Sequence, residues 1–329
     1  MKALVYTNKK FLEYKTVQNP RITEDDVLIK IESVGICGSD MHAFLGHDDR
    51  RPAPLILGHE AAGVIVEGEN SGKRVTVNPL VSCGECSACK RGRNNICPSR
   101  QLISIPPREG AFAEFLVIPK TNVLEVPENV DINHASLTEP LACGWHAVKL
   151  GMRTLDIPLV DSRCLIIGGG AIGVGVNLAL IAKGAKNVTM VDSNPLRCRM
   201  LVESFEAETI VLEQLNFGAE FDFIIDAVGY SKTREDACAF CKPGGVITHI
   251  GLGDKIGGLD VRKMTLQEIT FIGTYTYTPQ DFKETAEAIF NSQMGDFGWI
   301  EERSLEEGNE AFLDILHGKV SASKIILRP

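Results

Sequence analysis

"CLIIGGGAIGVGVNLALIAKG", residues Cys164–Gly184, is the stretch from which the organisation of the chain can be worked out. An apolar run typical of a buried strand leads through consecutive glycines into a segment with helical character over Ala171–Lys183. Gly168, Gly170 and Gly173 have the spacing GxGxxG between the strand and the helix. Such a turn lets a pyrophosphate approach backbone N–H groups at a helix N-terminus. The stretch therefore predicts a dinucleotide site.

The segment that follows the glycine-rich turn indicates which dinucleotide binds. Asp192 ends the strand-like run NVTMVD, nineteen residues after Gly173. A carboxylate at this distance can accept hydrogen bonds from both hydroxyls of the adenosine ribose. Because it would repel a 2′-phosphate, NAD is predicted rather than NADP. The alternative is that Arg197 or Arg199 admits a 2′-phosphate.

Two different patterns of apolar and polar residues along the chain indicate two kinds of structural unit. From residue 1 to about 150, short alternating runs such as DVLIKIESVGIC are broken by Gly, Pro and Asn, which predicts an irregular β-rich unit. From about residue 160, apolar runs such as FDFIIDAVG alternate with helical segments. This alternation is typical of a parallel sheet buried on both faces. The fold class is therefore α/β.

Charge and composition exclude several classes of partner. The net charge is −9 and no long basic run occurs, so neither a nucleic acid nor an anionic lipid surface is an expected partner. The N-terminus begins directly with a strand-like alternation and lacks the features of a signal peptide. Within Cys164–Ala182, five glycines and Asn177 argue against a membrane-spanning helix. We expect a cytoplasmic protein that is not bound to a membrane.

Four of the ten cysteines are clustered with the spacing CxxCxxCx7C, at Cys83, Cys86, Cys89 and Cys97. Short gaps let successive sulfurs turn toward one centre, and four thiolates complete the tetrahedral shell of Zn²⁺. A closed shell leaves no position for substrate, so the predicted role is structural. An iron–sulfur cluster and a set of reduced surface thiols are the alternatives.

A second pair of cysteines, CAFC at Cys238–Cys241, has the spacing of a redox motif. It lies in a predicted helix of the α/β part and is followed by the turn KPGG. We therefore interpret these two as packing thiols whose loss leaves activity intact.

A more open set of polar residues lies upstream. VGICGSDMHAF contains Cys37, LILGHEAAGVI contains His59 and Glu60, and SLTEPLACGWHAV contains Glu139. A thiolate, an imidazole and a carboxylate are the mixed ligands of catalytic zinc sites, which keep one position open. Singly, Cys37 could be a small buried residue, His59 a core histidine and Glu139 a helix cap.

Taken together, these motifs resemble the zinc-dependent medium-chain alcohol dehydrogenase family. GAFAEFLVIP and TEPLACGWHAV resemble its polyol (sorbitol-like) branch. The resemblance covers nearly the whole chain. It implies a GroES-like catalytic domain over residues 1–148 with both zinc sites, a Rossmann domain over 149–278, and a C-terminal return over 279–329 that completes the catalytic domain.

The resemblance also implies which residues bind the metal. Cys37, His59 and Glu139 would hold a catalytic zinc, with Glu60 as an alternating or water-mediated ligand. Cys143 is the competing third ligand. The clustered cysteines would hold a second, structural zinc, which makes two zinc ions per chain.

Ser39 and His42 occupy the positions of the family's proton relay. A bound cation makes an alcohol proton more acidic, and that proton must leave through hydrogen-bonding groups. Ser39 would take it first, then the nicotinamide ribose, and His42 would carry it to the solvent edge. A purely structural role for His42 is the alternative. Phe44, His47 and Asn78 are expected near the substrate.

Further cofactor contacts follow from the same resemblance. Arg197 stands where the family often places a basic residue beside the adenosine ribose. Ile172 in the glycine-rich turn, Val228 in DAVG and Leu252 in GLG are expected to contact the dinucleotide, because later strands end on the cofactor side of such a sheet.

The predicted activity is reversible, zinc-dependent transfer of a hydride between NAD and a secondary alcohol of the polyol or sugar-like class. The resemblance places this transfer across a cleft between the two domains. A threonine-type amino-alcohol dehydrogenase and a non-catalytic protein that binds NAD or zinc are the alternatives. Homodimers or homotetramers are usual in the family, often formed through strands such as ITFIGTYT, residues Ile269–Thr276.

Overall fold

The computed structural model describes residues 1–205, 208–211, 214–216 and 218–329, which form two compact units. Unit 1 comprises Met1–Glu139, Thr278–Ser292 and Ile300–Pro329, and unit 2 comprises Pro140–Tyr277 and Gln293–Trp299. The boundary predicted at residue 148 and the division after Glu139 both lie inside helix α4, Thr138–Met152. The apolar pattern of α4 continues across the division, so the sequence shows no change there.

The larger sheet of unit 1 has the strand order β10-β6-β5-β3-β18-β17, and β9 also pairs with β3. Its strands are β3 (Asp26–Gly35), β5 (Glu60–Glu67), β6 (Arg74–Val77), β9 (Phe115–Pro119), β10 (Val123–Glu125), β17 (Ile300–Ser304) and β18 (Lys324–Arg328). Strand β18 pairs antiparallel with β3, and this joins the C-terminal return to the N-terminal part of the chain. The C-terminal residues therefore reach the end of β3, where the candidate site begins.

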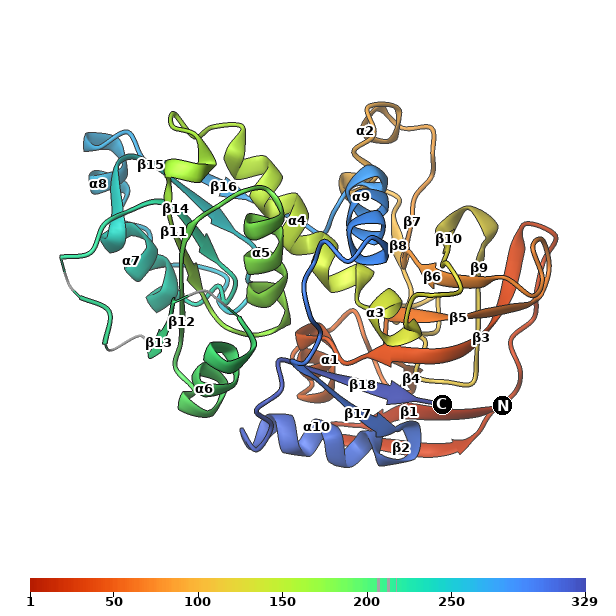
Figure 1. Cartoon of the computed structure of the whole chain (residues 1–329). Coiled ribbons are helices and arrows are strands. Elements are labelled where there is room, and N and C mark those ends of the chain that lie inside the picture. Colours follow the sequence, from red (N-terminus) through yellow and green to blue (C-terminus); the bar gives the residue numbers. More distant parts are fainter. Residues whose placement is uncertain (206–207, 212–213, 217) are drawn as a thin grey trace. The chain divides into compact units, whose positions relative to one another are not determined.

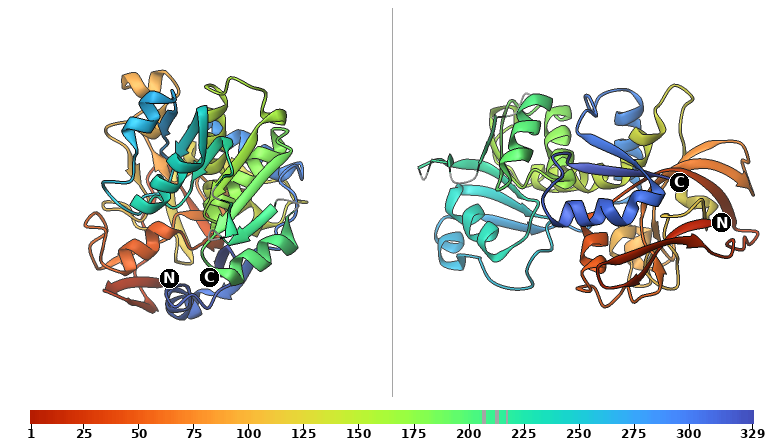
Figure 2. Two further views of the ribbon diagram at one scale, coloured as in Figure 1. Left: turned by 90° about the vertical axis from the view of Figure 1, so that its left-hand side faces the viewer. Right: turned by 90° about the horizontal axis from the view of Figure 1, so that it is seen from below.

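Smaller elements surround this sheet. A three-stranded sheet has the order β2-β1-β4, and β7 pairs with β8. These strands are β1 (Lys2–Asn8), β2 (Phe11–Thr16), β4 (Leu55–Ile56), β7 (Leu80–Val81) and β8 (Gln101–Leu102). The helices of the unit are α1 (Gly38–Phe44), α2 (Ser87–Lys90), α3 (Ile132–Ser136), α9 (Pro279–Phe290) and α10 (Gly308–Leu316). Both chain ends belong to this unit and lie near one another (Figure 2).

Three phenylalanines lie at the centre of the core of unit 1. The ring centroid of Phe312 lies 5.1 Å from that of Phe44 and 5.9 Å from that of Phe112. All three side chains are fully buried. The expectation that Phe44 lines the substrate site is therefore wrong, because its side chain fills the core behind α1. His47, by contrast, is exposed.

The described part of unit 2 holds a six-stranded parallel sheet with the order β13-β12-β11-β14-β15-β16. The strands are β11 (Arg163–Ile167), β12 (Asn187–Asp192), β13 (Glu208–Val211), β14 (Phe221–Asp226), β15 (Cys241–His249) and β16 (Thr270–Gly273). Helices α5 (Ala171–Ala182) and α6 (Pro195–Ser204) lie to one side of it, and α7 (Ser231–Phe240) and α8 (Val261–Leu266) to the other (Figure 1). The order reverses between β11 and β14, where sheets of this type bind ligands at the carboxyl ends of their strands.

The glycine-rich stretch divides as predicted into strand β11 and helix α5, which are joined by Gly168–Gly170. Apolar residues fill β11 because the sheet is covered on both faces. Among the described residues, no helix has the length and the apolar character needed to span a membrane.

Candidate active site

Cys37 lies at the junction between strand β3 and helix α1, where it is the N-cap residue of the helix. Its backbone N–H donates a hydrogen bond to Asp40 Oδ2 over 3.0 Å. Asp40 is completely buried, and its Oδ1 accepts a further bond from the N–H of Gly58 over 3.3 Å. This buried carboxylate therefore fixes the turn that presents the Cys37 thiol.

His59 immediately precedes strand β5 and is 4% exposed. Its Nδ1 lies 3.4 Å from Asp40 Oδ1 and 3.4 Å from Ser104 Oγ. Burial lowers the pKa of His59, but the negative charges of Asp40 and Cys37 outweigh it, so the pKa lies well above its ordinary value. Because Nδ1 faces a carboxylate, Nε2 is the nitrogen that remains to bind a metal.

Glu60, the first residue of β5, forms a buried ion pair with Lys324, the first residue of β18. The ammonium group lies 2.7 Å from both carboxylate oxygens and 2.8 Å from the carbonyl oxygen of Ile36. Burial lowers the pKa of Lys324, but the charges of Glu60, Cys37 and Glu139 raise it above its ordinary value overall. The pair connects the C-terminal strand to the candidate site.

Three of the predicted metal ligands lie close together. The Cys37 sulfur, a ring nitrogen of His59 and a carboxylate oxygen of Glu60 all lie within 4.8 Å of one another. A thiolate, an imidazole and a carboxylate in this proximity suit Zn²⁺. Glu139 is buried in the first turn of α4, but the group found among the described residues does not include it. Its role as a ligand, and that of Cys143, stays a prediction.

Ser39 lies beside the imidazole on helix α1. Its Oγ is 3.5 Å from His59 Nε2, so the hydroxyl adjoins the nitrogen that is available to a metal. His42 follows three residues later, which places it on the same face of the helix, and it is half-buried. The role of these two residues in a proton relay stays a prediction.

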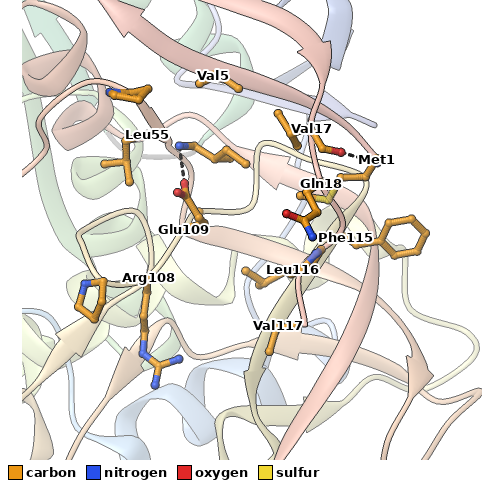
Figure 3. Close-up of a pocket in the computed structure, with 15 residues that line it drawn as sticks. Met1, Val5, Val17, Gln18, Leu55, Arg108, Glu109, Phe115, Leu116 and Val117 are labelled. Carbon is orange, nitrogen blue, oxygen red and sulfur yellow. Dashed lines mark hydrogen bonds between the residues drawn. The ribbon is translucent and has the colours of Figure 1, made fainter. Parts of the chain in front are cut away.

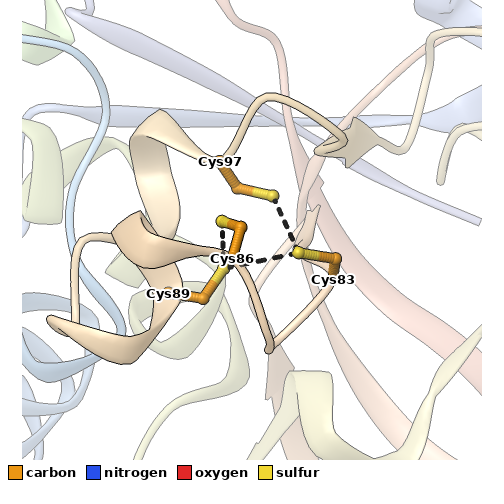
Figure 4. Close-up of side chains that lie close together, drawn as sticks. All are labelled: Cys83, Cys86, Cys89 and Cys97. Carbon is orange, nitrogen blue, oxygen red and sulfur yellow. Dashed lines mark hydrogen bonds between the residues drawn. The ribbon is translucent and has the colours of Figure 1, made fainter.

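The four clustered thiols converge on one point (Figure 4). The sulfur of Cys89 lies 3.9 Å from that of Cys83 and 3.5 Å from that of Cys86, and the sulfurs of Cys97 and Cys83 are 3.5 Å apart. A tetrahedral zinc with bonds of about 2.3 Å places its sulfurs about 3.8 Å apart. An iron–sulfur cluster would hold them further apart, because metal and sulfide ions lie between them. The spacing fits a single ion.

The acidities of these thiols differ. Hydrogen bonds from the backbone N–H groups of Cys86 and Glu85 lower the pKa of Cys83 to about 6. Burial and the neighbouring thiols raise the pKa of Cys89 to about 11. Because zinc binds thiolates, binding there must displace the proton of the less acidic Cys89.

The glycine-rich turn of unit 2 has the shape of a phosphate-binding loop. Gly168 has a φ of 102°, which disfavours any side chain. A Cβ at Gly173 would overlap the carbonyl oxygen of Gly168, so this glycine lets helix and turn pack closely. Gly170 is the N-cap of α5, and a Cβ there would meet nothing within 4 Å. This open space in front of the helix N-terminus fits a pyrophosphate.

Asp192 ends strand β12 beside this turn. Its Oδ2 accepts a hydrogen bond from the N–H of Gly169 over 2.7 Å, and its Oδ1 accepts one from Asn194 over 2.7 Å. Each oxygen keeps a lone pair that can accept a ribose hydroxyl. Arg197 Nη1 lies 3.6 Å from Oδ2, so the predicted acidic and basic residues adjoin one another.

The remaining predicted cofactor residues lie in the turn and in later loops. Val228 is half-buried, and Cγ2 of its side chain lies 2.5 Å from the position that a Cβ at Gly168 would occupy. Ile172 is also half-buried, in the first turn of α5. Leu252 is 72% exposed, in the loop after β15. Val228 therefore adjoins the turn, and contacts of these residues with a dinucleotide stay predictions.

The CAFC pair has the character of packing thiols. Cys238 lies in α7 and Cys241 begins β15, and both are 1% exposed. Burial raises the pKa of both thiols, that of Cys241 to about 12. Such thiols are poor nucleophiles.

A pocket of about 480 Å³ lies elsewhere in unit 1 (Figure 3). Met1, Val17 and Leu116 form part of its wall, and Glu109 accepts a hydrogen bond from the N–H of Ile56 over 2.7 Å. None of its lining residues is a predicted ligand or relay residue. The pocket is therefore separate from the candidate active site.

Reasoning from sequence alone gave no role to two residues of the site, Asp40 and Lys324. Asp40 follows Cys37 by three residues, which is the spacing of a capping box, and this signal was present. Lys324 opens the apolar run KIILR, where a lone lysine resembles an ordinary strand end. Only the pairing of β18 with β3 brings it to Glu60.

A mixed thiol, imidazole and carboxylate set in unit 1 and a dinucleotide turn in unit 2 define a metal-dependent oxidoreductase. Comparison with known proteins identifies the family. Residues 23–128 match the alcohol dehydrogenase GroES-like domain, and residues 171–291 match the zinc-binding dehydrogenase domain. The chain belongs to the zinc-dependent medium-chain alcohol dehydrogenase family, in its polyol branch. Zinc and a nicotinamide dinucleotide are the cofactors of this class.

Three relatives illustrate the likeness. Sorbitol dehydrogenase of Bacillus subtilis is 30% identical, over 100% of this chain and 97% of the relative. L-galactonate-5-dehydrogenase of Escherichia coli is 32% identical, over 89% of this chain and 88% of the relative. The crystal structure of galactitol-1-phosphate dehydrogenase from Escherichia coli is 25% identical, with a TM-score of 0.89 and coverage of 100% of both chains.

Proposed function

We propose that this protein reversibly oxidises a secondary hydroxyl of a polyol or sugar-like alcohol with NAD as the hydride acceptor. The observation that carries the proposal is the convergence of Cys37, His59 and a carboxylate in unit 1. Relatives named for sorbitol and L-galactonate support the substrate class. Glu139 in TEPLA, the feature that first indicated the polyol branch, is buried near the same site.

Cys37 and His59 are proposed to hold the catalytic zinc, with Glu139 as the third ligand. Glu60 is the alternating or water-mediated ligand, because Lys324 already engages both of its carboxylate oxygens. When bound there, zinc polarises an alcohol oxygen as a Lewis acid. The four-cysteine site is proposed to hold a structural zinc, whose closed shell takes no part in the reaction.

The chain's own residues are proposed to remove the alcohol proton. Ser39 Oγ accepts this proton as it releases its own hydroxyl proton toward His42, because it lies beside the imidazole nitrogen that faces the metal position. His42, on the same face of α1 and half-buried, receives a proton at a later step. Asp40 keeps His59 in the orientation that leaves Nε2 toward the metal position.

NAD is proposed in preference to NADP because of Asp192. Its carboxylate oxygens are fixed by backbone N–H groups on both sides, so the side chain cannot turn away from a 2′-phosphate. Arg197 lies 3.6 Å from the carboxylate and partly offsets its charge. Because Arg197 could also bind a 2′-phosphate, turnover is measured with both NAD and NADP.

A substrate panel tests the proposal. Polyols, sugar acids, phosphorylated polyols and L-threonine are incubated with NAD or NADP, and NADH or NADPH formation is followed by absorbance. We expect turnover of a polyol-like alcohol with NAD, its loss after chelation, and its return with added zinc. Glu139→Gln should lose activity, whereas the matched control Cys238→Ser should keep it. Turnover that survives complete removal of zinc would contradict the proposal, and turnover confined to L-threonine would reassign the substrate.

The proposal also covers the oligomeric assembly and the cellular location of the protein. Strand β16 lies at the end of the strand order of unit 2, so its outer edge can pair with a second copy. We propose a homodimer or homotetramer, which sedimentation can measure. We also propose a cytoplasmic location, because a reducing compartment keeps the clustered thiols available to zinc.

A further inference from the structure

Arg51 is a buried cation in the loop between α1 and β4. Its side chain is 1% exposed, whereas that of the adjacent Arg50 is 60% exposed. Both guanidinium groups bind the same carboxylate, Asp48, over 2.8 and 2.6 Å. A guanidinium is costly to bury unless its donors are engaged, so its remaining contacts indicate what it does.

The remaining contacts of Arg51 are with Ser39 and Ser104, which lie on opposite sides of the His59 ring. Arg51 Nε donates to the carbonyl oxygen of Ser104 over 3.0 Å, and Nη1 and Nη2 lie 3.4 and 3.5 Å from the carbonyl oxygen and Oγ of Ser39. Ser104 Oγ lies 3.4 Å from His59 Nδ1, and Ser39 Oγ lies 3.5 Å from Nε2. The Arg51 guanidinium group thus contacts both Ser39 and Ser104, the two serines whose hydroxyls lie on either side of the His59 imidazole.

The direction of these hydrogen bonds restricts the Ser39 hydroxyl. A guanidinium only donates, so Ser39 Oγ must accept from Nη2 and cannot direct its own proton there. The proton and the second lone pair of the hydroxyl are left to face other partners. A hydroxyl that accepts a proton from a substrate needs this preset orientation, because small errors in placement slow such steps.

We propose that Arg51 is a positioning residue that orients the Ser39 hydroxyl for removal of the substrate proton. The inference rests on the role of Ser39 proposed above. Arg51 is too deeply buried to contact substrate, and Asp48 offsets its charge, so it is not an anion-binding residue. The exposed Arg50 binds the same carboxylate and serves as the matched control.

A double-mutant cycle tests the inference. kcat and KM are measured for Arg51→Met, for Ser39→Ala and for the double variant, with the polyol that gives turnover. We expect Arg51→Met to lower kcat/KM about 10- to 100-fold, mainly through kcat, and to have less than about a twofold effect when Ser39 is already alanine. Arg50→Met should stay within about twofold of the parent.

Two further measurements separate positioning from loss of structure. Zinc content per chain and NADH affinity, followed by fluorescence, should be unchanged in Arg51→Met. If Arg51→Met does not fold, the double-mutant cycle is repeated with Arg51→Lys. Lysine keeps the positive charge but lacks the several N–H donors of the guanidinium group. For Arg51→Lys we expect a smaller fall in kcat than the one predicted for Arg51→Met, and this fall should again nearly disappear when Ser39 is alanine.

Other results would overturn the inference. Equal losses from Arg51→Met with and without the Ser39 hydroxyl would show a general structural role. A parent-like Arg51→Met would show no role in the reaction. A fully active Ser39→Ala would instead overturn the relay proposed above, which distinguishes failure of that proposal from failure of this one.

Discussion

Replacing Lys324 by methionine should strongly destabilise unit 1. The ammonium group donates to both oxygens of Glu60 at 2.7 Å and to the carbonyl oxygen of Ile36 at 2.8 Å. Lys324 is 3% exposed and Glu60 is 0% exposed, so water cannot replace these bonds. Methionine keeps much of the volume and removes only the charge and the donors.

The size of this destabilisation can be worked out from the Glu60 carboxylate, which stays buried without a cation after the substitution. A buried carboxylate without its cation costs about 3–5 kcal/mol. For a unit of this size, each kcal/mol lowers the melting temperature by about 2–4 °C, so we expect a fall of about 6–20 °C. Glu60→Gln combined with Lys324→Met removes both charges, and the remaining cost should be about 1–3 kcal/mol, that of unpaired polar groups.

The assay is thermal unfolding of the parent, both single variants and the double variant. Chelator is present throughout, so that a freed Glu60 carboxylate has no cation to bind. The double variant should melt above Lys324→Met, which gives a coupling energy of about 2 kcal/mol. Lys319→Met, at an exposed ion pair with Asp314, is the control and should change the melting temperature little.

The reasoning would be refuted by a Lys324→Met protein that melts within about 2 °C of the parent. A double variant less stable than both singles would also contradict it. Either result would mean that the carboxylate is hydrated or protonated without its partner.

Four further predictions concern other parts of the chain. Cys97→Ser should lose about one zinc per chain by metal analysis and lower the melting temperature, because three thiolates no longer close the shell; unchanged zinc content would argue against that site. Burial raises the pKa of Asp48, but neighbouring arginines lower it overall to about 2. The contribution of the ionised Asp48 side chain to the free energy of unfolding is therefore present at neutral pH and lost as pH falls from about 4 to about 2. Asp48→Asn leaves the buried Arg51 guanidinium without its carboxylate, so it should cost about 1–3 kcal/mol at pH 7 and reduce this loss at acid pH, as measured by urea unfolding. Asp192→Ala should lower kcat/KM about tenfold or more with NAD and less with NADP; an equal fall with both would remove its discriminating role. Cys238→Ser should keep turnover within about twofold, and a large loss would revive a redox role for CAFC.

Much of the fold was predictable because its signals are local. The glycine-rich stretch at Cys164–Gly184 contains strand, turn and helix in one short segment, and the structure has each where the pattern placed it. The four clustered cysteines lie within one loop, so their convergence needed little knowledge of the rest of the chain. The predicted boundary at residue 148 and the division after Glu139 both lie inside α4, whose continuous pattern marks neither position in the sequence.

The candidate site was only partly predictable, because several residues that contact the predicted ligands are far from them in the sequence. Cys37, His59 and Glu60 were found by residue type and motif, but the partners that fix them are distant in the chain or lack a motif. Lys324 reaches Glu60 only because β18 pairs with β3. Phe44 was expected near substrate, yet the side of α1 that it occupies is covered by Phe312 of α10.

The sequence by itself determined the class of chemistry, since ligand types, glycine spacing and the acidic residue after β12 are chemical requirements written in short segments. The tertiary structure alone decided that Lys324 neutralises the buried Glu60 and that Arg51, paired locally with Asp48, is buried beside Ser39 and Ser104. The physical reason is that a buried charge needs a partner within about 4 Å, and only the packed chain brings such partners together.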